Sequence, residues 1–202
     1  DTIGGFNSMI EKEKKLDVDA HVTTVLFNDQ YKMLYNRREL KDVRKMTDKD
    51  YTPGGMTALL DAVGRTIHKM DMVSGIHRKD KGNKVLFVII TDGEENDSRE
   101  YTYADVKKLI KDRQENAGWE FIFLGANIDA AAAAENLGID RDRAVKYKNT
   151  GSGVRANFKA VAELSDSLAK SGRVSDEWKE TVEKDEDDAA DKRSAAVTLH
   201  RR

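Results

Sequence analysis

The segment that most constrains the fold is Val85 to Ile90, which reads VLFVII without a polar interruption. A strand with one face in water alternates apolar and polar residues, whereas a strand covered on both faces is apolar throughout. The run ends abruptly in the polar sequence TDGEENDS. We therefore expect a central strand of a parallel sheet, followed directly by an acidic loop.

Strand and helix patterns alternate on both sides of this run. The segments His21 to Phe27 and Tyr31 to Tyr35 flank the turn signal Asn28-Asp29, which predicts an antiparallel hairpin. Further strands are predicted at Phe121 to Leu124 and Ala144 to Tyr147. Helical spacing of apolar residues predicts helices at about 2–15, 59–70, 103–114, 129–136 and 153–168. The predicted fold class is α/β: a three-layer αβα, Rossmann-like architecture with a mainly parallel sheet and one antiparallel edge hairpin strand.

Length and composition favour one domain with a tail. The chain has 202 residues, enough for one α/β core, and its charge becomes dense after Ser171. We expect one domain over residues 1–170 and a charged, flexible or loosely helical tail over residues 171–202. The formal net charge of -2 gives no positive field that would attract nucleic acid. No apolar run is long enough for a membrane span.

The absence of cysteine excludes disulfides, thiolate metal sites and a cysteine nucleophile. It also favours a cytoplasmic location. The sequence begins with Asp1 rather than methionine, and shows neither a basic start nor an apolar signal core, so we expect a fragment or a processed product.

Two loops carry the candidate metal ligands. Thr57 ends the loop TPGGMT just before a predicted helix, and Asp92 follows the most apolar strand. Carboxyl ends of parallel strands meet at one edge of a sheet, where hydroxyl and carboxylate oxygens suit Mg²⁺. The alternative is local: Thr57 would cap the helix, and Asp92-Gly93 would be an ordinary turn. Spacing alone leaves both interpretations open.

The order of these segments resembles the von Willebrand factor type A family, including its bacterial members. The resemblance covers about residues 1–170 and rests on the hairpin, TPGGMTALLDAV, VLFVIITDGEEN and FIFLGANID. In that family a metal-ion-dependent adhesion site combines an Asp-x-Ser-x-Ser motif, a threonine and an aspartate from three loops. Thr57 matches the threonine and Asp92 matches the aspartate. The resemblance implies Mg²⁺ as the cofactor, with Mn²⁺ or Ca²⁺ as substitutes.

The chain also departs from the family pattern. No Asp-x-Ser-x-Ser motif occurs, and the sequence starts at what resembles the family's first helix. In the family the first strand lies between the strands that match His21 to Phe27 and Val85 to Ile90. An upstream segment or another chain is expected to supply this strand, because unpaired buried backbone groups are costly. With Thr57 and Asp92 alone, metal binding is expected to be weak.

The resemblance implies a non-enzymatic protein–protein interaction module. Its metal would be completed by an acidic side chain of a protein partner, and no residue is assigned a catalytic role. One alternative is a Mg²⁺-dependent phosphohydrolase or phosphotransferase that uses Asp92, for which Glu94 and Glu95 are the nearby carboxylates. Another alternative is a metal-free structural scaffold that the charged tail tethers to a larger assembly.

Overall fold

The structure is a computed structural model that describes residues 1–16, 19–74 and 84–184. The helices and strands alternate along the chain as the sequence predicts. In order they are α1 (Thr2–Glu13), β1 (His21–Phe27), β2 (Tyr31–Glu39), α2 (Leu59–Ser74), β3 (Leu86–Thr91), α3 (Tyr103–Ala117), β4 (Glu120–Ala126), α4 (Ala130–Leu137), β5 (Ala144–Tyr147) and α5 (Gly151–Ser171). Two short 3₁₀ turns are added, η1 (Leu40–Asp42) and η2 (Arg141–Arg143).

The strands form two separate sheets. β3, β4 and β5 make a parallel sheet in that order, while β1 and β2 make an antiparallel pair. The hairpin extends four residues beyond the predicted Tyr35, because the polar segment to Glu39 keeps pairing as far as His21. A polar edge strand gives no apolar signal in the sequence. The mixed α/β class is thus confirmed, and the likeness to one family stays a prediction.

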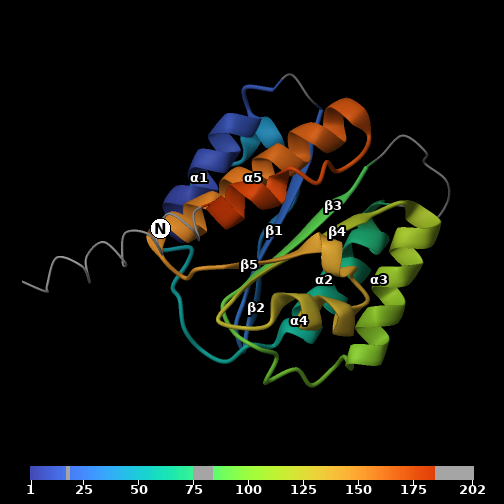
Figure 1. The fold of residues 1–202 in the computed structure, drawn as a ribbon. Helices are drawn as coiled ribbons and strands as arrows, with labels where there is room; N and C mark the ends of the chain where they lie inside the picture. Colours follow the sequence, from blue (N-terminus) through green and yellow to red (C-terminus); the bar gives the residue numbers. More distant parts are fainter. Residues whose placement is uncertain (17–18, 75–83, 185–202) are drawn as a thin grey trace, which may run out of the picture.

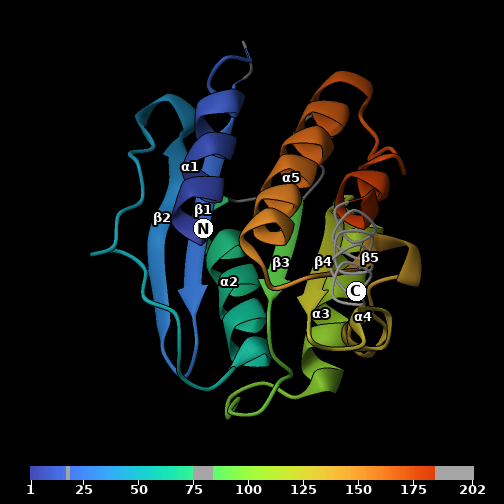
Figure 2. The same ribbon diagram turned by 60° about the vertical axis from the view of Figure 1, so that its left-hand side comes forward.

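Helices cover both sides of the strands. Figure 1 shows α1 and α5 on one side and α2, α3 and α4 on the other. In Figure 2 the strands are seen in the order β2, β1, β3, β4 and β5. The parallel sheet therefore has helices on both faces, which explains why 86–90 of β3 and 121–126 of β4 carry no polar side chain.

Local sequence fixes the helix ends. Thr102 and Asp105 form a reciprocal capping box at the start of α3, and Gly118 ends that helix with a φ of 68°. Asp129 and Thr150 cap α4 and α5 through their side chains. None of the described helices is long and apolar enough to cross a bilayer.

The folded unit continues beyond the predicted boundary at residue 170. Val174, Trp178 and Val182 are buried at 6%, 1% and 2% exposure and join the apolar cluster between the sheet and α5. Val174, Trp178 and Val182 lie at helical spacing, but the charged residues between them hide this pattern in the sequence. Residues 185–202 of the predicted tail lie outside the described residues.

Glu13, at the end of α1, is a buried carboxyl with an incomplete set of hydrogen bonds. Its Oε2 accepts a 2.8 Å bond from the Ser165 hydroxyl, and its Oε1 has no partner among the described residues. Burial raises the pKa of Glu13, and the bond from Ser165 only partly opposes that rise. The ionised form is therefore disfavoured in the folded chain.

We expect Glu13→Gln to stabilise the fold at pH 7, because the amide keeps an acceptor for Ser165 without a buried charge. Because the pKa of Glu13 is raised in the folded chain, the stability that depends on its neutral form is fully present below its unfolded pKa. That stability is lost as pH rises through the folded pKa. The gain from the glutamine should therefore shrink as pH falls toward 4. Urea unfolding of both proteins at the two pH values checks this, and an equal difference at both would contradict it.

Candidate site at the carboxyl edge of the strands

Thr57 and Asp92 both lie at the carboxyl edge of the strands, in loops that contact each other. Thr57 is attached to the loop after β3 through Asn96 by two hydrogen bonds. The Thr57 backbone N–H donates to Asn96 Oδ1 at 2.7 Å, and the Asn96 N–H donates to the Thr57 carbonyl at 3.0 Å. The structure therefore brings together the two loops that the sequence singled out.

Gly93 is the point of closest approach between these loops. A Cβ added at Gly93 would lie 3.1 Å from the Thr57 hydroxyl oxygen, which is tighter than an ordinary contact. The Thr91 hydroxyl donates to the Gly93 carbonyl at 3.0 Å and fixes the backbone of the turn. The Thr57 hydroxyl thus lies beside the residue that follows Asp92.

Asp92 is exposed and is contacted by two asparagines from neighbouring loops. Asn149 Nδ2 donates to Asp92 Oδ2 at 3.2 Å, and Asn127 Nδ2 reaches the Asp92 carbonyl at 3.5 Å. Asn127 has a φ of 59°, a left-handed conformation that asparagine tolerates better than most residues. These side chains come from the ends of β4 and β5, so all three parallel strands contribute to this edge.

Tyr147, the last residue of β5, is affected by the charge of Asp92. Burial raises the pKa of the Tyr147 phenol well above its ordinary value, and the carboxylate of Asp92 and the phenol of Tyr51 raise it further. Tyr147 therefore stays a neutral phenol under all ordinary conditions. Its phenol does not act as a base near neutral pH.

The interpretation of Thr57 as a helix cap does not hold. The Leu60 N–H donates to Glu95 Oε2 at 2.9 Å, and the Asp61 N–H donates to the Ser98 hydroxyl at 3.0 Å. These first amides of α2 are satisfied by the acidic loop, so the Thr57 hydroxyl is not needed for them. Its position next to Gly93 is a consequence of loop packing.

Asp61 and Glu95 are the residues that shape this edge, and sequence reasoning missed their role. The carboxylate of Asp61 is buried and accepts the backbone N–H groups of Arg99, Glu100 and Tyr101 at 2.9–3.0 Å. Burial alone would raise the pKa of Asp61, but these three bonds outweigh it and the pKa is lowered. The only sequence signal for this role was an acidic residue in the first turn of a helix, where it can accept hydrogen bonds from the backbone of a nearby loop.

Glu95 makes the opposite contact: it lies in the loop after β3 and accepts from the start of α2. Besides capping Leu60, its carboxylate accepts the N–H groups of Asp97 and Ser98 and the Ser98 hydroxyl, at 2.7–3.0 Å. A carboxylate with these partners is a structural acceptor, so it is not a free base beside Asp92. That removes one of the two carboxylates on which the phosphotransferase alternative depends.

The donor set for a metal is small. The described residues contain no group of three or more His, Cys, Asp or Glu side chains placed to hold a metal ion. At this edge the oxygen ligands on hand are the Thr57 hydroxyl and the Asp92 carboxylate. Mg²⁺ prefers about six oxygen ligands, so these two fit it only in part and most of its shell would come from water or from a partner.

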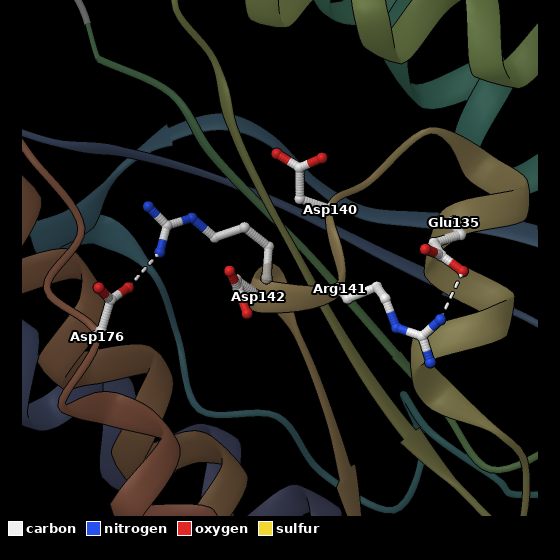
Figure 3. A pocket seen from close by; sticks show the side chains of 6 residues that line it. Glu135, Asp140, Arg141, Asp142 and Asp176 are labelled. Atoms are coloured by element: carbon white, nitrogen blue, oxygen red, sulfur yellow. Dashed lines mark hydrogen bonds and ion pairs between the residues drawn. The ribbon is translucent and has the colours of Figure 1, made fainter.

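Two open, polar depressions lie elsewhere on the surface of the described residues. Figure 3 shows the first, of about 440 Å³, at the amino end of β5. Its cations are paired, with Arg141 bonded to Glu135 at 3.1 Å and Arg143 to Asp176 at 2.8 Å. The second, of about 450 Å³, lies beside the candidate edge and is lined by Glu94, Asn127, Asp129 and Lys146 among others. Neither Thr57 nor Asp92 lines either of them.

Comparison with known proteins adds no assignment for this edge. The chain matches no protein-family model, and no curated protein is significantly similar to it.

Proposed function

We propose that this chain is a protein–protein interaction module of the von Willebrand factor type A kind. It binds its partner at the carboxyl edge of the strands, where Thr57 and Asp92 are partial ligands for Mg²⁺. An acidic side chain of the partner would add a further oxygen. The observation that carries the proposal is the double hydrogen bond between Thr57 and Asn96, which holds the Thr57 hydroxyl next to the Asp92-Gly93 turn.

The chemistry of the edge supports this role over catalysis. Asp92 is exposed and its carboxylate is available to an incoming group, while Asp61 and Glu95 are engaged by backbone donors. Asn149 donates a hydrogen bond to Asp92, and neither it nor the neutral phenol of Tyr147 titrates near neutral pH. A rim that carries the exposed carboxylates of Asp92 and Glu94 suits the binding of a cation or a polar ligand. Among the described residues of this rim, Glu95 is held by backbone donors and is not paired with Asp92 as the acid or base that hydrolysis needs.

The test is to locate a paramagnetic ion on the protein. We expect Mn²⁺ to broaden the backbone amide signals of Thr57, Asp92 and Gly93 in a ¹⁵N spectrum, with a dissociation constant of about 1 mM or weaker. Asp92→Ala should abolish the broadening, because it removes the only charged ligand, and Thr57→Ala should weaken it by about threefold to tenfold. Mg²⁺ in excess should compete the effect away.

Asp142 provides the matched control. It lies just before the amino end of β5, away from the carboxyl edge of the strands, and its side chain is 95% exposed. Asp142→Ala should leave the broadening at Thr57 and Asp92 unchanged. Broadening confined to Asp142 and its neighbours, or an unaltered pattern in Asp92→Ala, would refute the metal part of the proposal.

A further inference from the structure

Two of the exposed apolar side chains lie at the carboxyl edge of the strands. Among the described residues, the large apolar side chains that folding leaves exposed are Met56, Met72 and Tyr103, at 51%, 84% and 44%. Met72 lies near the end of α2, whereas Met56 comes shortly before α2 and Tyr103 begins α3. Figure 2 shows both helices starting at the end of the molecule where β1 and β3 end. Exposed apolar side chains gathered at one edge are typical of a binding surface.

The loop that carries Met56 is fixed on both sides of this residue. Asn28 Nδ2 donates to the Gly54 carbonyl at 2.9 Å, and Thr57 makes its two hydrogen bonds with Asn96. Gly54 has a φ of 127°, which only glycine adopts readily. The side chain of Met56 therefore projects into water from an anchored backbone.

Tyr103 lies beside the acidic loop after β3. Burial raises the pKa of its phenol, and the charges of Glu95 and Glu94 raise it further, so both carboxylates are near the phenol. The same loop is bonded to the residue that follows Met56. The two exposed apolar side chains thus flank one acidic loop.

The charge of this edge has a single sign. The loops that meet here contain five acidic residues and no Lys or Arg; they are residues 28–30, 52–57 and 92–97. Asp29, Asp92 and Glu94 in these loops are exposed. The whole chain, by contrast, is nearly balanced at a formal net charge of -2. This edge therefore attracts a positively charged partner and repels a negative one.

The depression beside this edge combines acidic groups with small apolar ones. It measures about 450 Å³, and Glu94 lines it together with Asp129. Its buried lining residues are Ile128, Ala130 and Ala144. Small apolar side chains leave room for the long stem of a lysine or arginine, whose charged head stays at the rim.

The charges that line the depression also favour a cation. Asp129 Oδ1 accepts the Ala132 N–H at 3.0 Å and so compensates the positive end of α4. Lys146 is the one cation among the lining residues, against the carboxylates of Glu94 and Asp129. Its charge opposes a bound lysine or arginine, which makes the effect of removing it a test of sign.

We propose that this edge binds a segment of a partner protein in which apolar side chains stand next to lysine or arginine. An apolar side chain of the segment packs on Met56 and Tyr103. A basic side chain enters the depression, with its stem on the alanines and its charge beside Glu94. The inference rests on the proposed function only for the location of the partner, and it needs no metal at Asp92.

The first test uses the hexapeptide acetyl-GLRLKG-amide as the probe, in the presence of EDTA. It should shift the backbone amide signals of Met56, Glu94 and Tyr103 to saturation, with a dissociation constant of about 1 mM. Two other peptides should bind at least about tenfold more weakly: acetyl-GLELEG-amide reverses the charge, and acetyl-GSRSKG-amide lacks the apolar side chains. Raising NaCl from about 20 mM to about 300 mM should weaken the first peptide severalfold, because salt screens exposed charges.

Substitutions then assign the contacts. Met56→Ser and Tyr103→Ser should each weaken binding of the first peptide by about threefold to tenfold, and Glu94→Lys by at least about tenfold. Lys146→Ala should strengthen it by about twofold, because the opposing cation is removed. All four side chains are exposed, so each melting temperature should stay within about 2 °C of the parent chain.

Met72→Ser and Glu115→Lys are the matched controls. Met72 is an exposed apolar residue near the end of α2, and Glu115 is an exposed carboxylate near the end of α3. These ends lie away from the carboxyl edge of the strands. Both variants should therefore leave the dissociation constant of the first peptide unchanged.

The outcomes separate the parts of the proposal. Equal or tighter binding of the acidic peptide, or weaker binding in Lys146→Ala, would overturn the assignment of a basic partner. Shifts that do not saturate by about 10 mM peptide, or binding that survives Met56→Ser and Glu94→Lys, would overturn this surface. Loss of the Mn²⁺ effect with retained peptide binding would refute only the metal at Asp92. The Mn²⁺ effect without peptide binding would refute only the present inference.

Discussion

Trp178→Ala is expected to lower the free energy of unfolding by about 3–5 kcal/mol, the largest effect of any single side chain outside the sheet. Trp178 is 1% exposed and packs with Leu164, Leu168 and Val182 on the cluster that covers β4 and β5. Removing its indole leaves a cavity next to the sheet. Urea unfolding followed by circular dichroism measures the loss.

Trp178→Phe separates packing from hydrogen bonding. The indole Nε1 is buried without a partner among the described residues, so phenylalanine removes an unsatisfied donor while it keeps most of the apolar volume. We expect it to cost less than half as much as alanine. A loss below about 1 kcal/mol for Trp178→Ala would mean that residues 173–184 do not belong to the folded unit.

Asp61→Ala should have the second largest effect, a loss of about 2–4 kcal/mol at pH 7. The substitution leaves the N–H groups of Arg99, Glu100 and Tyr101 without their common acceptor. The loop from Asp92 onward would lose these three bonds to α2, while Glu95 and Ser98 would still accept from the first amides of the helix. Hydrogen exchange of these three amides should accelerate more than that of β4, and thermal unfolding gives the global loss.

Asp97→Ala is the matched control in the same loop. Asp97 makes a 3.2 Å ion pair with Arg99, which is 82% exposed, so its removal should cost less than about 1 kcal/mol. Asp61→Asn should fall between the two, because one oxygen remains for Glu100 and Tyr101 while the new NH₂ faces the Arg99 donor. Equal losses for Asp61→Ala and Asp97→Ala would contradict the role of Asp61.

The effect of Asp61 also has a definite pH dependence. Its pKa is lowered in the folded chain by the three backbone donors, although burial opposes them. Its contribution is therefore present above the unfolded pKa of about 3.9 and is lost as pH falls through the folded value. The difference between the parent chain and Asp61→Ala should shrink in strongly acidic solution.

The sequence determined which segments become strands and helices. The apolar run of β3 and the hairpin turn at Asn28-Asp29 were read correctly, since apolar periodicity and turn residues act locally. It also placed Thr57 and Asp92 at one edge, because strand ends in a parallel sheet converge. The polar end of β2 and the packing of Trp178 were missed, since neither has a continuous apolar pattern.

The tertiary structure decided what the candidate edge is made of. Asp61 and Glu95 read as ordinary acidic residues until the fold places α2 against the loop after β3, about 35–40 residues away in sequence. The buried carboxamide of Asn157, which has no hydrogen-bond partner among the described residues, was likewise visible only in three dimensions. Local propensity sets the elements, while pairing and burial depend on contacts between segments that the sequence keeps apart.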